Sequence, residues 1–190
     1  PPPGPYCMKK LLIITLIAVA ANIVVHGQKK VVKKPTAKPK VAALSVAKPT
    51  ETPFVREKFD PLRDPKADLA EAVITATKEN KRIILDIGGE WSGCCDYIDK
   101  FFYKNPKLDK LRNDNYVWIK VNMSEENENP AFLSAYPTIN GYPHLYVLEA
   151  DGRLLHSQDT SPLEAGKGYD LAKFTAFLKA WVPKRVESKP

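Results

Sequence analysis

The run from Asp86 to Cys95, Asp-Ile-Gly-Gly-Glu-Trp-Ser-Gly-Cys-Cys, constrains the fold more than any other part of the chain. It continues an apolar stretch, 82–87, that is typical of a strand covered on both faces. Helical spacing of apolar residues resumes after the cysteines. The run therefore predicts a strand–loop–helix unit that presents Cys94 and Cys95 in the first turn of a helix. Unpaired N–H groups and the helix dipole favour a thiolate at that position.

The positive charge of the chain lies almost entirely in its N-terminal part. The formal net charge is +7, and residues 1–50 contain nine lysines and no acidic residue. The remainder carries 20 basic and 22 acidic residues, a net charge of −2. No stretch interleaves Lys or Arg with aromatic residues in the pattern of a nucleic-acid surface. We therefore expect no nucleic-acid partner and a nearly neutral, soluble mature domain.

Residues 1–27 predict a signal peptide with preceding non-native or misread residues. Met8-Lys9-Lys10 precedes about fifteen mostly apolar residues, fewer than the roughly 20 that span a membrane. Cleavage fits either after Ala20 or after Gly27, and the alternative is an uncleaved N-terminal anchor. Export places the domain in the periplasm or outside the cell. Cys7 would then be absent from the mature protein, which leaves Cys94 and Cys95 as its thiols.

The chain after the leader divides into a linker, one domain and a short tail. Residues 28–58 form a linker rich in Lys, Pro and Ala, and its composition predicts a solvated, semi-extended segment. We place the globular domain at 59–185 and the tail at 186–190. Within the domain, caps and apolar periods predict helices from Pro65, at 93–103, after Pro106 to Arg112, from Pro130 and at 170–181, and strands at 82–87, 116–122, 144–148 and 153–156. This alternation predicts an α/β domain with a mixed sheet.

Residues 59–183 resemble the thioredoxin superfamily, and in particular exported thioredoxin-like proteins. The family pattern is strand–Asp–x₄–Trp–Cys–x–x–Cys–helix, and this chain matches it at Asp86, Trp91 and Cys95. It departs from the pattern at Ser92, which stands where the first cysteine belongs. Gly141-Tyr142-Pro143 before a strand matches the family's second conserved loop, whose proline is cis and faces the cysteines. The resemblance implies a central mixed β-sheet flanked by helices on both faces, here with a disordered N-terminal extension.

Ser92 changes what the two cysteines can do. The first cysteine of such a centre attacks and the second resolves the mixed disulfide, and a hydroxyl cannot replace the attacking thiol. Ser92 can instead cap the helix by accepting from the N–H of Cys94 or Cys95. Adjacent helical cysteines have Cα atoms about 3.8 Å apart, closer than disulfide geometry requires. We therefore expect Cys94 and Cys95 to react with external groups rather than with each other.

The resemblance assigns roles to the remaining site residues. Cys95 takes the place of the buried resolving thiol and Cys94 lies nearer the surface, which makes Cys94 the expected nucleophile. The alternative is an inert pair of small buried hydrophobic residues. Asp86 takes the place of a buried carboxylate beneath the second cysteine, with a raised pKa and a role in proton transfer.

A second group of residues is expected to bind an extended peptide. Trp91 and Tyr142 would flank the thiols as an apolar platform, and core packing is the alternative for both. Gly141 and Pro143 would leave backbone groups open for β-addition.

A metal or cofactor is not expected. His144 follows the predicted cis-proline, but adjacent cysteines chelate poorly and no fourth ligand is evident. We interpret His144 as a strand residue packed near the sheet. Asp96 and Asp99 follow the cysteines on the same helix, and we interpret them as favourable partners of the helix dipole.

The sequence favours thiol–disulfide exchange through an altered Ser-x-Cys-Cys centre. The partners would be protein thiols or disulfides of exported clients and, beyond these, a membrane redox partner. One-thiol chemistry on proteins with impaired dithiol activity is the expected mechanism. Two alternatives remain open: a non-catalytic peptide-binding or chaperone module, and a carrier of a metal or cluster.

Overall fold

A computed structural model describes residues 56–166 and 168–184 of the chain. The predicted signal peptide, most of the predicted linker and the predicted tail lie outside the described residues. Within the described part, no helix is long and apolar enough to cross a membrane.

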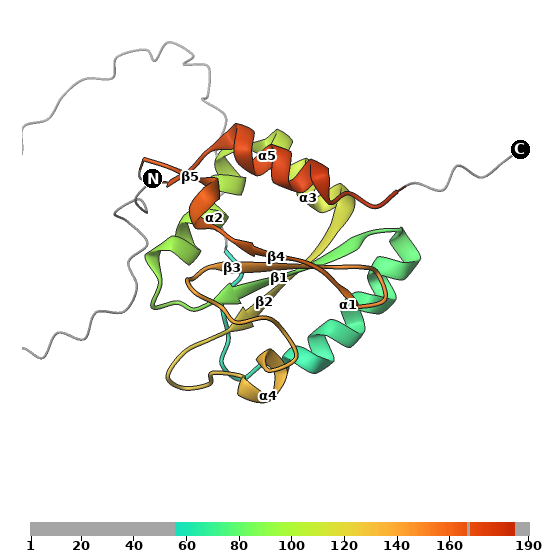
Figure 1. Ribbon diagram of the computed structural model, residues 1–190, viewed down its shortest axis with the longest axis vertical. Helices are drawn as coiled ribbons and strands as arrows, with labels where there is room; N and C mark the ends of the chain where they lie inside the picture. Colours follow the sequence, from blue (N-terminus) through green and yellow to red (C-terminus); the bar gives the residue numbers. More distant parts are fainter. Residues whose placement is uncertain (1–55, 167, 185–190) are drawn as a thin grey trace, which may run out of the picture. The chain divides into compact units, whose positions relative to one another are not determined.

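The centre of the domain is a mixed sheet of four strands in the order β2-β1-β3-β4 (Figure 1). β1 (Arg82–Gly88) pairs in parallel with β2 (Tyr116–Asn122). β3 (His144–Leu148) pairs antiparallel with β1 on its other side, and β4 (Leu154–Asp159) forms the far edge. β1 is therefore a central strand, and six of its seven residues are buried, as its continuous apolar run predicted.

Helices cover both faces of this sheet (Figure 1). One face carries α2 (Gly93–Lys104), α3 (Pro106–Asn115) and α5 (Leu171–Ala180). The opposite face carries α1 (Pro65–Glu79) and the single turn α4 (Pro130–Leu133). The expected architecture, a mixed sheet flanked by helices on both sides, is confirmed.

Caps set the ends of these helices. The Asp64 side chain accepts from the N–H of Lys66 at 2.9 Å, and Pro65 occupies the first helical position. Asn80 ends α1 in the left-handed conformation with φ 50°. Asn105 separates α2 from α3, as the Asn-Pro pair predicted, and its amide donates to the Phe101 carbonyl at 2.7 Å.

Three elements differ from the predictions. α3 continues beyond Arg112 to Asn115, whose side chain donates to the carbonyl of Leu111. β4 continues to Asp159, because it stays paired with β3 along its length. The loop after β4 contains a 3₁₀ turn at Ser161–Leu163 and a small hairpin of β5 (Glu164–Ala165) and β6 (Gly168–Tyr169). Two-residue strands carry too little alternation for sequence reasoning to detect.

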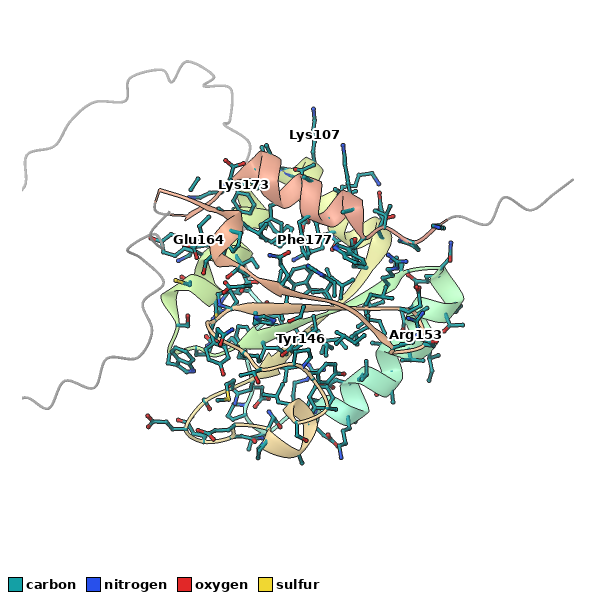
Figure 2. The ribbon with its side chains drawn as sticks, viewed as in Figure 1. Lys107, Tyr146, Arg153, Glu164, Lys173 and Phe177 are labelled. Carbon is teal, nitrogen blue, oxygen red and sulfur yellow. The ribbon has the colours of Figure 1, made fainter. Side chains whose placement is uncertain are left out.

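The pleat of the strands sends successive side chains into two separate cores. Ile84, Leu145 and Val147 pack against α2, α3 and α5. Ile83 and Leu85 belong to the core beside α1. Figure 2 shows Phe177 and Tyr146 on opposite sides of the sheet, one in each core. Asp86 follows Leu85 and therefore points to the α2 face, which decides where the site forms.

Candidate functional site

The loop between β1 and α2 forms the candidate site. β1 ends at Gly88 and α2 begins at Gly93, with Ser92 as its N-cap residue in an extended conformation. The N–H of Ser92 donates to the Gly89 carbonyl at 3.0 Å, and the Ser92 carbonyl accepts from the N–H of Cys95 at 3.1 Å. The predicted strand–loop–helix unit is thus present, with both cysteines in the first turn.

Ser92 occupies the cap position, but its side chain makes no capping hydrogen bond. The prediction that its oxygen accepts from a helix N–H is therefore wrong. The hydroxyl instead hydrogen-bonds the side chain of Cys95, which lies one helical turn further on. Ser92 is itself buried, at 8% exposure, so its hydroxyl has the thiol as a polar neighbour in place of water.

Cys95 lies at the bottom of the site. Its side chain is completely buried, and it is a free thiol. The expectation that the adjacent cysteines do not pair with each other is confirmed. An ideal Cβ placed on Gly88 would lie 2.4 Å from the sulfur of Cys95, a distance that no real contact reaches. The sulfur therefore rests directly against the backbone of β1, and glycine at position 88 makes this approach possible.

Burial raises the pKa of the Cys95 thiol to about 11, and the negative charge of Asp86 acts in the same direction. Hydrogen bonds from Ser92 and from the backbone at Gly89, together with the charge of Lys120, oppose this shift. The thiol is therefore protonated near neutral pH despite its place at a helix N-terminus. Desolvation outweighs the dipole here.

Cys94 lies in the same turn and is disulfide-bonded. It is 9% exposed, slightly more than Cys95, so the predicted order of accessibility holds although both side chains are buried. The hydroxyl of Tyr169, from β6, lies 3.5 Å from the Cys94 carbonyl. The small hairpin that the sequence did not predict thus packs beside α2, next to this cysteine.

Asp86 lies on the sheet beneath α2, as the sequence predicted, and is fully buried. Burial raises its pKa, and the charge of Lys120 opposes that shift. One carboxylate oxygen accepts from Trp118 Nε1 at 3.1 Å and from Lys120 Nζ at 3.3 Å. The other oxygen has no hydrogen-bond partner within the part of the chain that the structure describes. An unpartnered buried oxygen is expensive and is typical of a site that exchanges protons.

Lys120 and Asp99 belong to the site, and sequence reasoning missed both. Lys120 is buried, and its ammonium lies 2.9 Å from Asp99 as well as beside Asp86. Burial alone would lower its pKa, but the two carboxylates raise the pKa above the ordinary value. Asp99 is only 9% exposed and forms ion pairs with Lys120 and Arg56, which its interpretation as a partner of the helix dipole did not include. The sequence did carry one signal for Lys120: it is a lysine within an otherwise largely apolar strand, two residues after Trp118.

Trp91 and Tyr142 form an aromatic pair at the rim of the site. Their ring centroids are 5.6 Å apart in an edge-to-face arrangement. Trp91 is 50% exposed and donates through Nε1 to the Met123 carbonyl at 2.6 Å, so it is not a core residue. Tyr142 is partly buried against the core on the α1 face.

The loop before β3 lies next to this pair. The Tyr142–Pro143 peptide bond is cis. The Pro143 carbonyl accepts from the buried hydroxyl of Thr160 at 2.8 Å, so the expectation that this group stays open for a peptide is wrong. An added Cβ on Gly141 would meet nothing within 4 Å, which leaves space on that side of the loop.

His144 points away from the cysteines. It is paired with Ile87 across the β1–β3 ladder, whereas Asp86 is paired with Leu145. Paired residues share a face of the sheet, so His144 lies on the α1 face. There it contacts Tyr146, and its Nε2 lies 2.8 Å from Ser157 Oγ. No group of His, Cys, Asp and Glu with metal-binding geometry occurs in the described residues.

The fold and this site define a thioredoxin-like domain. A family described as "Thioredoxin-like" matches residues 64–150. The structure is similar to that of a disulphide isomerase from Xylella fastidiosa Temecula1, with a TM-score of 0.55 and 19% identity over 67% of this chain and 98% of that one. The described domain has a thioredoxin-like fold, as the sequence predicted.

A curated relative is similar over part of its length. The "Thiol:disulfide interchange protein DsbD" of Colwellia psychrerythraea is 25% identical over 115 residues, which is 60% of this chain. The aligned region spans only 18% of the length of that relative.

Proposed function

We propose that this protein is an exported thiol–disulfide exchange protein that works with one reactive thiol, Cys94, on protein substrates. The unequal placement of two adjacent sulfurs is the observation that carries this proposal. Cys95 is a free thiol sealed beneath the first turn of α2 with a raised pKa, whereas Cys94 is 9% exposed and disulfide-bonded. Once a thiol reductant has opened the Cys94 disulfide, a thiolate at Cys94 gains from the helix N-terminus.

The exchange step needs no external oxidant. A thiol reductant first displaces Cys94 from its disulfide and becomes bonded to the other sulfur of that disulfide. The Cys94 thiolate then attacks one sulfur of a client disulfide, the client S–S bond breaks, and a Cys94–client disulfide forms. The departing client thiolate takes a proton from water. Reversal by a second thiol releases the client. Ser92 cannot resolve the mixed disulfide, and Cys95 is too close along the chain to pair with Cys94, so dithiol reduction is impaired.

The buried charges support chemistry rather than passive binding. Removing one partner of a buried ion pair is strongly destabilising, yet well-packed apolar residues stabilise a core equally well. Asp86 and Lys120 are therefore not needed for stability alone. Beneath the sulfur of Cys95 they can hold its proton and keep this thiol out of the exchange reaction.

Export and partners are part of the proposal. The leader at 1–27 supports a periplasmic or secreted protein, with membrane anchoring as the alternative. The relative from Colwellia psychrerythraea is a thiol:disulfide interchange protein, which supports protein thiols or disulfides as clients. A membrane redox partner beyond these clients belongs to the proposal. Trp91 and Tyr142 would contact the client beside the cysteines, since Trp91 is half exposed.

A non-catalytic peptide-binding module is the second candidate, and the burial of both cysteines favours it. The two candidates differ in their dependence on sulfur. Binding through Trp91 and Tyr142 would persist without either thiol, whereas exchange requires Cys94.

The test is disulfide reduction by the full-length chain, with insulin as the substrate and a dithiol as the reductant. We expect slow turnover that Cys94→Ser abolishes and Cys95→Ser leaves largely intact. Ser92→Cys restores the Cys-x-x-Cys spacing and should raise turnover at least tenfold. Turnover that survives both Cys→Ser substitutions would exclude thiol chemistry. Client binding that is unchanged in both variants, without turnover in the wild type, would establish the second candidate.

A further inference from the structure

Residues 56–59, which we call the clasp, cross the edge of the site ahead of α1. Phe59 is almost completely buried, at 2% exposure. The ammonium of Lys120 lies 4.3 Å from the centroid of the Phe59 ring, in a cation–π contact. The same ring reaches the strand beneath the sulfur, because a Cβ on Gly88 would lie 3.2 Å from Phe59 Cζ. One aromatic ring thus covers both the ammonium and the floor on which Cys95 rests.

The clasp is fastened to the redox loop and to α2 by charged contacts. The N–H of Phe59 donates to Glu90 Oε1 at 2.9 Å, and the Arg56 guanidinium pairs with the same carboxylate. Arg56 also donates to Asp99 at 3.1 Å and lies 3.6 Å from Asp96. Arg56 and Lys120 therefore hold Asp99 from two sides.

We propose that the clasp keeps Cys95 unreactive, by excluding water from Lys120 and from the sulfur of Cys95. Arg56 and Phe59 are positioning residues in this scheme, since they act through Lys120, Asp99 and the floor beneath the sulfur. The inference rests on the proposed one-thiol function. With the clasp in place, Cys95 stays protonated and takes no part in exchange. Without it, water reaches Cys95 and this thiol becomes reactive as well.

Several charged or titratable groups face the sulfur of Cys95, and they must stay constant for a clean test. They come from several elements around it: Asp86 on β1, Lys120 on β2, Ser92 at the N-cap of α2, and Tyr169 on β6. Asp99, in the second turn of α2, and Arg56 act on the site through their ion pairs with Lys120 and with each other. A substitution of Phe59 adds or removes no charge. A change in the ionisation of Cys95 in that variant therefore reports solvent access to the site.

The experiment measures alkylation of Cys95 by iodoacetamide against pH in the reduced full-length chain carrying Cys94→Ser. Mass spectrometry of the peptide that contains residue 95 gives the rate. Phe59→Ala should lower the midpoint of the pH profile by one unit or more, so that alkylation at pH 8 becomes about tenfold faster. Phe59→Leu, which keeps an apolar cover, should restore most of the original midpoint.

Two further variants separate the clasp from general loss of stability. Phe132→Ala removes a buried aromatic side chain on the α1 face and should leave the midpoint unchanged. Phe59→Val removes the ring but keeps a smaller apolar side chain and changes no charge, and it should shift the midpoint in the same direction as Phe59→Ala but less.

An unchanged midpoint in folded Phe59→Ala protein overturns the inference. If that variant does not fold, an unchanged midpoint in Phe59→Val overturns it instead. Because alkylation needs no disulfide substrate, the result does not depend on the exchange assay. Exchange that proves absent would refute the proposed function while leaving the measured effect of the clasp on Cys95 in place.

Discussion

The two faces of the central sheet bury different kinds of side chain, although these side chains come from neighbouring residues of the same strands. On the α1 face, β1 and β2 contribute Ile83, Leu85, Ile119 and Val121 to an aliphatic core. On the α2 face the alternate positions include Asp86 and Lys120, which are buried beside Asp99. Figure 2 shows both layers filled with side chains. The comparison teaches that charge is buried in this domain where a sulfur lies above it, and hydrocarbon where stability alone is needed.

The largest expected effect comes from removing the shared cation of the α2 face. Lys120→Met leaves two buried carboxylates, Asp86 and Asp99, without their common partner, and should lower the free energy of unfolding by about 3–5 kcal/mol at pH 7. Burial already raises the pKa of Asp86 in the folded protein. The loss should therefore shrink as the pH falls and Asp86 takes up a proton. Urea unfolding at pH 7 and pH 5 measures both.

The adjacent residue on the other face provides the control for this experiment. Ile119→Val shortens a side chain in the aliphatic core and should cost about 0.5–1.5 kcal/mol at both pH values. If Lys120→Met is as mild as Ile119→Val, or equally insensitive to pH, the contrast between the two faces is wrong.

The next effect tests the close approach of Cys95 to β1. Gly88→Ala places a methyl group 2.4 Å from the sulfur and 3.2 Å from the Phe59 ring, so the backbone must move. We expect a loss of about 2–3 kcal/mol in the free energy of unfolding. The second substitution Cys95→Ala removes the sulfur and should recover part of this loss. Denaturant unfolding of the single and double variants gives the coupling.

Gly93→Ala is the matched control, because an added Cβ there meets nothing within 4 Å. Gly93 is the first residue of α2, and alanine should be neutral or stabilise by up to about 1 kcal/mol. A loss at position 93 that equals the loss at position 88 would contradict the steric explanation.

The smallest effect lies outside both cores. Asp64→Ala removes the side-chain cap of α1, which accepts from the N–H of Lys66, and should cost about 1 kcal/mol. Asp64→Ser keeps a capping oxygen and should cost less. Thermal unfolding followed by circular dichroism detects the difference, and both variants should leave alkylation of Cys95 unchanged. A changed alkylation rate would mean that α1 and the site are coupled.

Local signals in the sequence predicted most of the fold. Asp64-Pro65 and Asn105-Pro106 fix helix boundaries through caps and the missing proline N–H, and such signals need no tertiary information. Strand β2 was predicted with its observed bounds because its residues are nearly all apolar or aromatic. The β5–β6 hairpin was missed because two paired residues carry no periodicity.

The site was predictable only where a motif spanned it. Asp86, Ser92 and Cys95 lie on one continuous run, so their proximity followed from the resemblance. Lys120 and Arg56 reach the site from positions distant in the sequence, and their roles depend on burial that a charge pattern alone does not reveal. The Ser92 hydroxyl also had two possible partners, a helix N–H or the thiol, and only the structure distinguishes them.

Gly88 has a consequence for any modification of the buried thiol. The sulfur of Cys95 already touches main-chain atoms of a central strand, which is paired on both sides and has little freedom to retreat. Oxygen atoms added to this sulfur, or a client joined to it, would find no room toward the strand. Such adducts could form only if the first turn of α2 moves away from the sheet. Oxidation of the Cys95 sulfur would therefore displace the start of this helix.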